Sequence, residues 1–470
     1  MSHATGATTR LCAGLLAIAS LSAALACDPQ VDTAQPCPDS GWPALVGAQY
    51  TFIRQHQSRL DSPYEGRLSL DPNGDTEQTH TIGMYFGWAM TSWAQVYLDV
   101  EKFMGAGVSN SVGLAGLTNG DVVREGAAGL PKVFYIARQY VRLMLPLAPG
   151  TTPVEAGQDQ VGGREAGTRL EFKFGALAAS DDFDHNRYAS STRTQFLNWS
   201  LWDNTAWDYA ADTRGYTYGA VIGFVSPLGS LKYGAYLMPR KANGQELEDA
   251  PRRARGDNLE LTLPPSRMGT VVRLLAYRNL ARMGDYREAL QIAAATGTII
   301  PDIVADDREG RHKYGLGINV EQPLADDGET GAFVRLGWND GNTESFAFTE
   351  VDRLVSVGAQ VSGRRWTRTD DRIGAAVAFE GLSGPHRDYL AAGGSGFLLG
   401  DGRLDYAQEQ ILELYYRVQL PWPFNDSTRV FQKYPLKIQL TPDFQYIRNP
   451  AYNRDRGPVK FWAVRWHLEL

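Results

Sequence analysis

The chain has 470 residues and a formal net charge of −7; 21% of the residues are charged, 11% are aromatic and 49 are glycine. No basic segment is long enough to suggest a nucleic-acid-binding protein. The aromatic and glycine content favours strands and turns over helices. A mean hydropathy of −0.31 does not exclude a membrane protein, because apolar and polar residues that alternate along a strand cancel in an average.

The N-terminus has the pattern of a secretory signal peptide. Arg10 precedes an apolar run at 11–26 that ends in Ala-Leu-Ala, and such a run with a small-x-small end is removed after export. We therefore expect residues 1–26 to be a signal peptide and residues 27–45 to be an N-terminal periplasmic segment. Cys27 and Cys37 remain after cleavage. An oxidising compartment favours a disulfide between them, and lipidation of Cys27 is the alternative.

The rest of the chain repeats a two-residue alternation. In 462–470 (WAVRWHLEL) the alternation predicts that Trp462 and Trp466 face lipid and that Arg465, His467 and Glu469 face a polar lumen. Segments of the same kind predict sixteen strands, at 47–57, 78–88, 92–103, 132–144, 168–178, 216–226, 229–240, 257–264, 267–279, 312–323, 330–340, 353–364, 372–382, 409–420, 435–447 and 459–470.

The connections between these strands alternate between short and long. Short turns fall at 89–91, 226–228, 264–266 and 324–329, and longer segments fall at 104–131, 179–215, 241–256, 280–311 and 383–408. This asymmetry is typical of outer-membrane barrels, which have short periplasmic turns and long external loops. The sequence therefore predicts an all-β protein: a 16-stranded antiparallel transmembrane β-barrel over residues 46–470, in the bacterial outer membrane.

Four features fit this topology less simply. The connections 145–167 and 421–434 are long for periplasmic turns, and 280–296 has helical spacing, which predicts a short helix in an external loop. Pro442 removes a ladder hydrogen bond from its strand, so we expect it near a rim or at a bulge.

Several long runs resemble the carbohydrate-selective porin family of OprB type. They are KYGLGINVEQPL (313–324), GAFVRLGWNDGNTESFAFTEVDR (331–353), YLAAGGSGFLLGDGRLDY (389–406), LTPDFQYIRNPAYNRDRGPV (440–459) and, upstream, QFLNWSLWDNTAWDYAADTRGYTYG (195–219). The resemblance implies a sixteen-stranded outer-membrane channel that passes sugars by diffusion through a narrowed eyelet, without a cofactor. It also implies outer-membrane lipid, lipopolysaccharide and the barrel assembly machinery as partners, for a monomer or a homo-oligomer. Leu470 departs from the aromatic residue that usually ends such barrels.

Selectivity in a pore depends on its diameter, its charge and its hydrogen-bonding groups, so the candidate residues are those expected at a constriction. The third external loop, 179–215, is the best candidate to fold inward, and the second loop carries a mixed-charge cluster that is expected to face it. The alternative for the tryptophans is a rim girdle or a role in pinning the loop. The candidates for the constriction are Asp121, Arg124, Glu125, Asp182, Arg193, Asn198, Trp199, Trp202, Trp207 and Asp208, together with the neighbouring acids Asp181 and Asp184.

Alternation assigns a second group of charged residues to the lumen wall: Glu171, Lys173, Arg335, Glu413, Arg417 and Arg465. Arg252, Arg253 and Arg255 in the fourth loop are expected to meet anionic lipopolysaccharide or solvent.

Other classes of function remain as alternatives. A general diffusion porin, a barrel-type outer-membrane enzyme and a secreted β-rich carbohydrate-binding protein or glycosidase share parts of the pattern. No His-Glu-x-x-His, Gly-x-Ser-x-Gly or Walker sequence is present, and the seven scattered histidines do not suggest a metal site. We therefore predict a channel and no enzyme.

Overall fold

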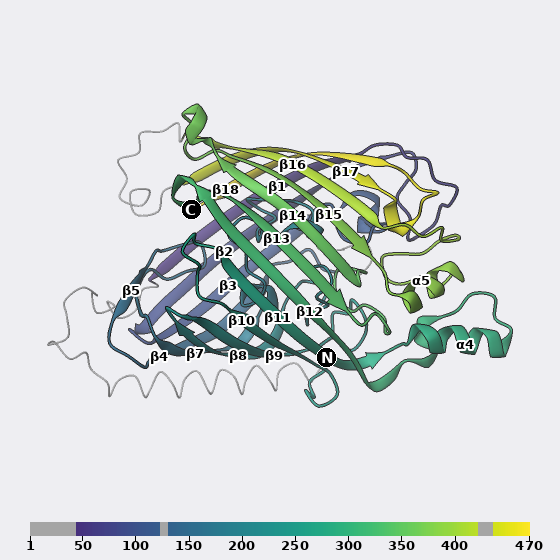
Figure 1. Ribbon diagram of the computed structural model, residues 1–470, viewed down its shortest axis with the longest axis horizontal. Helices are drawn as coiled ribbons and strands as arrows, with labels where there is room; N and C mark the ends of the chain where they lie inside the picture. The colour runs from purple at the N-terminus through teal and green to yellow at the C-terminus, as the bar shows by residue number, and fades with distance from the viewer. Residues whose placement is uncertain (1–43, 123–129, 422–435) are drawn as a thin grey trace.

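In the computed structural model, which describes residues 44–122, 130–421 and 436–470, sixteen antiparallel strands close into one barrel (Figure 1). The strands are β1 Leu45–Gln57, β2 Asp75–Thr91, β3 Ala94–Gly105, β4 Tyr135–Pro146, β7 Arg169–Leu177, β8 Thr217–Ser226, β9 Gly229–Leu237, β10 Arg255–Thr262, β11 Val271–Met283, β12 Arg308–Ala325, β13 Thr330–Asn339, β14 Arg353–Ser362, β15 Arg372–Gly381, β16 Glu409–Leu420, β17 Lys437–Arg448 and β18 Val459–Glu469. All sixteen predicted strands are confirmed, and the largest boundary error is four residues, as at β11.

The barrel closes where β18 pairs with both β17 and β1. His467 lies opposite Thr51 on β1 and opposite Gln439 on β17. Along β18 exposure alternates as predicted: Trp462 and Trp466 are 44% and 38% exposed on the outer face, whereas Arg465 and His467 are buried inside. The two-residue period therefore decides which face of each strand lines the lumen.

The two ends of the barrel differ. Eight long loops leave one end: L1 (58–74), L2 (106–134), L3 (178–216), L4 (238–254), L5 (284–307), L6 (340–352), L7 (382–408) and L8 (449–458). L3, L5 and L7 contain the helices α3 Trp199–Trp202, α4 Tyr286–Thr296 and α5 Gly384–Ala391. Figure 1 shows α4 and α5 at the end opposite the C-terminus. The helix predicted within 280–296 is confirmed as α4.

The long connection between β4 and β7 is a hairpin at the short-turn end. It contains the two-stranded sheet of β5 Thr151–Val154 and β6 Gly163–Ala166. Its tip enters the mouth of the barrel, where the Val161 amide donates to the Tyr97 hydroxyl at 3.2 Å. Inward-facing glycines make room for the tip, because a Cβ on Gly87 would lie 2.6 Å from the Val161 side chain. The other long connection, 421–434, falls almost wholly outside the described residues.

Pro442 lies in the middle of β17, so the expectation of a rim or a bulge is wrong. Its side chain faces outward, and it pairs with Val464 on β18. On the other side, pairing with β16 is interrupted between Tyr415–Asp443 and Val418–Leu440 without a change of register. The missing N–H of a proline explains a local break in one ladder.

Residues 1–43 are outside the described part of the chain, so the signal peptide, the segment 27–45 up to residue 43 and the Cys27–Cys37 disulfide stay predictions. Within the described ranges, no helix has the length and apolar character needed to cross a membrane.

Candidate functional site

Loop L3 folds into the barrel and is held there by buried charges of the wall. Arg335 on β13 is fully buried; it contacts the Asp184 carboxylate at 2.7 Å and donates to the carbonyl oxygens of residues 184, 189 and 201. Glu413 on β16 accepts the amides of residues 197 and 198 at 2.6 and 2.9 Å. Arg465 on β18 donates to the carbonyl oxygens of residues 192 and 195 at 2.6 and 2.9 Å. The inward-facing charges therefore satisfy loop backbone that has no sheet partner.

The three tryptophans of L3 differ in exposure. Trp207 is 1% exposed and its indole N–H donates to Asn258 at 2.9 Å. Trp199 is 6% exposed, and its ring stacks on Phe348 of L6 at 4.8 Å between centroids. Trp202 is partly exposed and contacts Trp199 at 4.6 Å. In this structure Trp199 and Trp207 pack the loop, and Trp202 retains a surface that a solute can reach.

Loops L2 and L3 meet at an ion-pair cluster centred on Arg193. Its Nε lies 2.9 Å from Asp121 of L2, and its Nη1 lies 3.2 Å from Glu101 on the inner face of β3. Nη1 also donates to the Tyr85 hydroxyl at 3.1 Å. Asp121 and Arg193, 72 residues apart, are thus brought together as anticipated for facing loops. Arg124 and Glu125 lie outside the described residues.

A second arginine, Arg138 on β4, extends this cluster and was not among the candidates. It contacts Asp181 of L3 at 2.6 Å and Asp99 of β3 at 3.2 Å. Burial by itself would raise the pKa of Asp181, but Arg138 holds that pKa below its usual value. The side chains of Arg138 and Asp181 are 16% and 31% exposed. Together with Arg193, at 19% exposed, they offer charged hydrogen-bonding groups to water inside the barrel.

Aromatic rings lie beside the two arginines. The guanidinium of Arg138 lies 5.2 Å from the ring of Tyr216, whose hydroxyl donates to Glu101, and Tyr216 contacts Tyr135 at 6.0 Å. A bulge brings Tyr135 and Arg138 to the same face, because the pairing of β3 with β4 shifts register next to Asp99. Strict alternation would have placed these two residues on opposite faces. The inner-face position of Glu101 was the one sequence signal for this cluster.

The other predicted residues form pairs with the wall. Asp182 pairs with Lys173 at 2.9 Å and Asp208 with Lys313 at 3.1 Å. The remaining contacts are Asn198 to Gln445 at 3.0 Å, Glu171 to Arg142 at 2.9 Å and Arg417 to the Thr194 carbonyl at 2.8 Å. All six predicted wall charges face inward, and Arg335, Glu413 and Arg465 are completely buried.

Above the constriction, a buried histidine joins L5, L6 and L7. His386 of α5 bonds Asp352 at 3.1 Å and the hydroxyl of Tyr286 at 3.1 Å, and lies 3.8 Å from Glu350. Burial would lower the pKa of His386, but Asp352 and Glu350 raise it above its usual value. In turn, His386 lowers the pKa of Asp352 to about 2 against the effect of burial. A cavity of about 550 Å³ opens beside Tyr286 and Glu350 between the loops.

These groups suit weak recognition of a polar solute rather than a reaction. Carboxylates and guanidinium groups hydrogen-bond hydroxyls, and aromatic faces cover apolar surface. Among residues 44–122, 130–421 and 436–470, no group of three or more potential ligands is arranged to hold a metal ion.

A closed barrel that is apolar outside, polar inside and narrowed by inward-folded loops has the architecture of an outer-membrane porin. The family described as "Carbohydrate-selective porin, OprB family" matches residues 87–470, which is more than half of the chain. The chain therefore belongs to the carbohydrate-selective porins of the OprB family, and it is a sugar porin of the bacterial outer membrane.

Solved structures share the fold at low sequence identity. The high-pH structure of Pseudomonas putida OprB has a TM-score of 0.65 at 14% identity, with 90% of this chain and 94% of that chain covered. The low-pH structure of Pseudomonas putida OprB has a TM-score of 0.43 at 10% identity, covering 90% and 92%. Pseudomonas aeruginosa OccK5 (OpdH) has a TM-score of 0.39 at 9% identity, covering 92% and 100%. No curated protein matches the chain.

Proposed function

We propose that neutral sugars cross this porin through the gap between L2, L3 and the inner faces of β2–β4. The observation that carries the proposal is the pair of arginines, Arg138 and Arg193, held among Glu101, Asp181 and Asp121 with part of each guanidinium exposed. Donors and acceptors of both signs stand close together there. Such a set hydrogen-bonds the hydroxyls of a sugar without attracting one sign of ion.

Aromatic contact completes the proposed eyelet. Tyr135 and Tyr216 line the same region as Arg138, and their rings match the apolar face of a pyranose. The exposed part of Trp202 is proposed as a further contact on the L3 side. Partial exposure keeps each interaction weak, which a channel needs because the solute must also leave.

The proposal assigns no chemical reaction to the chain. Family and structural neighbours are porins, which are channels, and we propose that this porin acts only by passive diffusion. Sugars are its proposed solutes, and lipopolysaccharide and the barrel assembly machinery are its proposed partners, as a monomer or a homo-oligomer. Arg252 and Arg253 are exposed on L4, where contact with lipopolysaccharide or solvent stays a prediction.

Solute flux into liposomes tests the sugar selectivity. The wild-type barrel is expected to pass glucose faster than an amino acid or an anion of similar mass. Equal rates would contradict the selectivity and leave a general diffusion porin.

Two variants test the eyelet itself. R138Q/D181N preserves the net charge but removes a charged donor and a charged acceptor, and R187Q removes an arginine of L3 whose ion pair with Glu329 is exposed. We expect the sugar concentration that half-blocks single-channel current to rise about tenfold in the first variant, since a charged hydrogen bond contributes at least ~1.5 kcal/mol. R187Q should match the wild type, and an unchanged value in R138Q/D181N would place the sugar elsewhere.

A further inference from the structure

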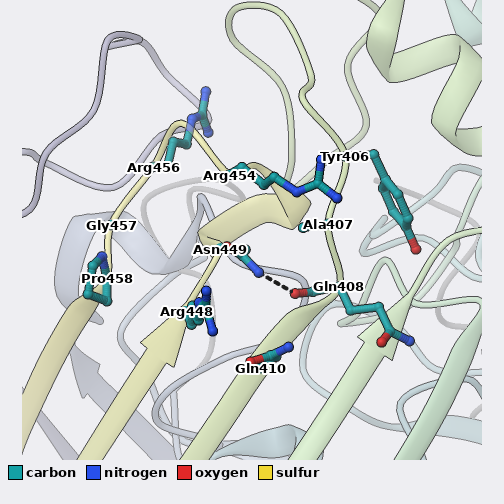
Figure 2. Close-up of a pocket in the computed structure, with 10 residues that line it drawn as sticks. All are labelled: Tyr406, Ala407, Gln408, Gln410, Arg448, Asn449, Arg454, Arg456, Gly457 and Pro458. Atoms are coloured by element: carbon teal, nitrogen blue, oxygen red, sulfur yellow. Dashed lines mark hydrogen bonds between the residues drawn. The ribbon is translucent and has the colours of Figure 1, made fainter.

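A cleft of about 570 Å³ lies on the outer wall at the long-loop end of the barrel. Figure 2 shows that its lining comes from the end of β17, the start of β16 and the loops L7 and L8. The sugar path proposed above does not use this cleft, because Gln410 and Arg448 belong to the outward-facing positions of their strands.

The cleft stands at the boundary of the lipid-facing band. Gln410 pairs with Arg448, and the next outward pairs toward the other end of the barrel are Leu412–Tyr446 and Leu414–Phe444. Apolar outer positions thus begin directly below a polar, positively charged pair. In an outer-membrane barrel, the height at which the apolar band ends is the height of the lipid head groups.

The charge of the cleft is one-sided. Its ten lining residues include Arg448, Arg454 and Arg456 and no acid. Arg448 is exposed and makes no ion pair with any described residue. Arg454 has only Asp405, at 3.4 Å, with both side chains more than half exposed, and such pairs contribute little. Two guanidinium groups are therefore available to an anion.

Arg456 is the independent sign that an anion belongs here. Only 4% of it is exposed, its guanidinium donates to carbonyl oxygens of L7, and its Nε has no partner among the described residues. Burial lowers its pKa. A buried cation without a carboxylate in contact is costly unless a negative charge lies nearby. On the neighbouring strand, outward-facing Lys460 adds to the same positive field.

We propose that this cleft binds the phosphate of a phosphorylated glycolipid of the outer leaflet, that is, of lipopolysaccharide. Arg448 and Arg454 are the phosphate ligands, since the planar guanidinium fork matches phosphate oxygens. The side chain of Gln410 lies next to Arg448 (Figure 2), where it can hydrogen-bond the hydroxyls of the sugar that carries the phosphate. The inference gives the proposed lipopolysaccharide contact a defined site, and it does not depend on the selectivity of the pore.

Binding of purified, detergent-solubilised barrel to lipid A tests the site. The probes are bisphosphorylated lipid A, dephosphorylated lipid A and inorganic phosphate, and the variants are R448Q/R454Q and the control R365Q, an exposed arginine in the turn at the opposite end. We expect bisphosphorylated lipid A to bind R448Q/R454Q roughly thirtyfold more weakly than wild type, as the loss of two interfacial charges implies. R365Q should bind as the wild type does.

Three results would overturn the proposal. They are equal affinity of R448Q/R454Q and wild type, equal binding of dephosphorylated and bisphosphorylated lipid A, and binding of inorganic phosphate as tight as that of the lipid, which would mean an adventitious ion only. If R448Q/R454Q fails to fold, as its mobility on a gel without heating would show, R448K/R454K and a salt titration of the wild type decide instead. The lysine variant should keep part of the affinity, and wild-type binding should weaken with salt; salt-independent binding would refute the site.

Discussion

Replacing Arg335 with methionine is expected to release loop L3 while leaving the barrel closed. The side chain is completely buried, contacts Asp184 at 2.7 Å and donates to three loop carbonyl oxygens. Methionine fills a similar volume but leaves a buried carboxylate without its counter-charge. Removing one member of a buried ion pair costs about 3–5 kcal/mol. The strands keep their own ladders, so this cost falls on the attachment of the loop.

Hydrogen exchange of the folded barrel in lipid nanodiscs measures that attachment. A cost of ~3 kcal/mol corresponds to a rise of roughly 150-fold in the open population of L3, so its amide exchange should accelerate by that factor. The exchange of β13 should change little. Single-channel conductance should rise at the same time, because the loop narrows the lumen.

R187M is the matched control for R335M. Arg187 also joins L3 to the short-turn end, but its pair with Glu329 is 3.4 Å long and the two side chains are 44% and 39% exposed. An exposed pair contributes about 1 kcal/mol or less. The double variant D184N/R335M removes the stranded carboxylate and should recover part of the loss. If R335M and R187M exchange and conduct alike, buried charge is not what holds L3.

Three further predictions concern other parts of the molecule. Since the pKa of His386 is raised in the folded protein, its stabilisation of the L5–L7 contact is complete below pH ~6.5 and is lost as pH rises through the raised value; exchange of α4 and α5 should therefore accelerate from pH 6 to 9 in the wild type, and the acceleration should be absent in H386Q. Replacing 155–162, the hairpin tip in the barrel mouth, with a short glycine–serine turn should raise single-channel conductance, and unchanged conductance would mean that the tip does not restrict the pore. Val464→Arg on the lipid face of β18, where Val464 is 42% exposed, should cost about 2–4 kcal/mol in urea unfolding in lipid, whereas Lys460→Arg at the strand end should be nearly neutral; equal effects would contradict the assigned lipid face.

The sequence by itself determined the wall of the barrel. Side-chain direction on a strand has a period of two, and lipid and water lie on opposite sides of every strand. For this reason the outward positions of Trp462 and Trp466 and the inward positions of Arg465 and His467 were predictable, as was the number of strands. Each of these properties depends on neighbours within a few residues along the chain.

Only the tertiary structure decided how the lumen is filled. The burial of Trp207 depends on Asn258, the pairing of Asp121 with Arg193 joins two loops, and a bulge in β4 places Tyr135 beside Arg138. These arrangements depend on contacts between distant parts of the chain and on a one-residue change of register, and neither leaves a periodic signal. The strands could therefore be placed from the sequence, whereas the composition of the constriction became visible only once the loops were in the barrel.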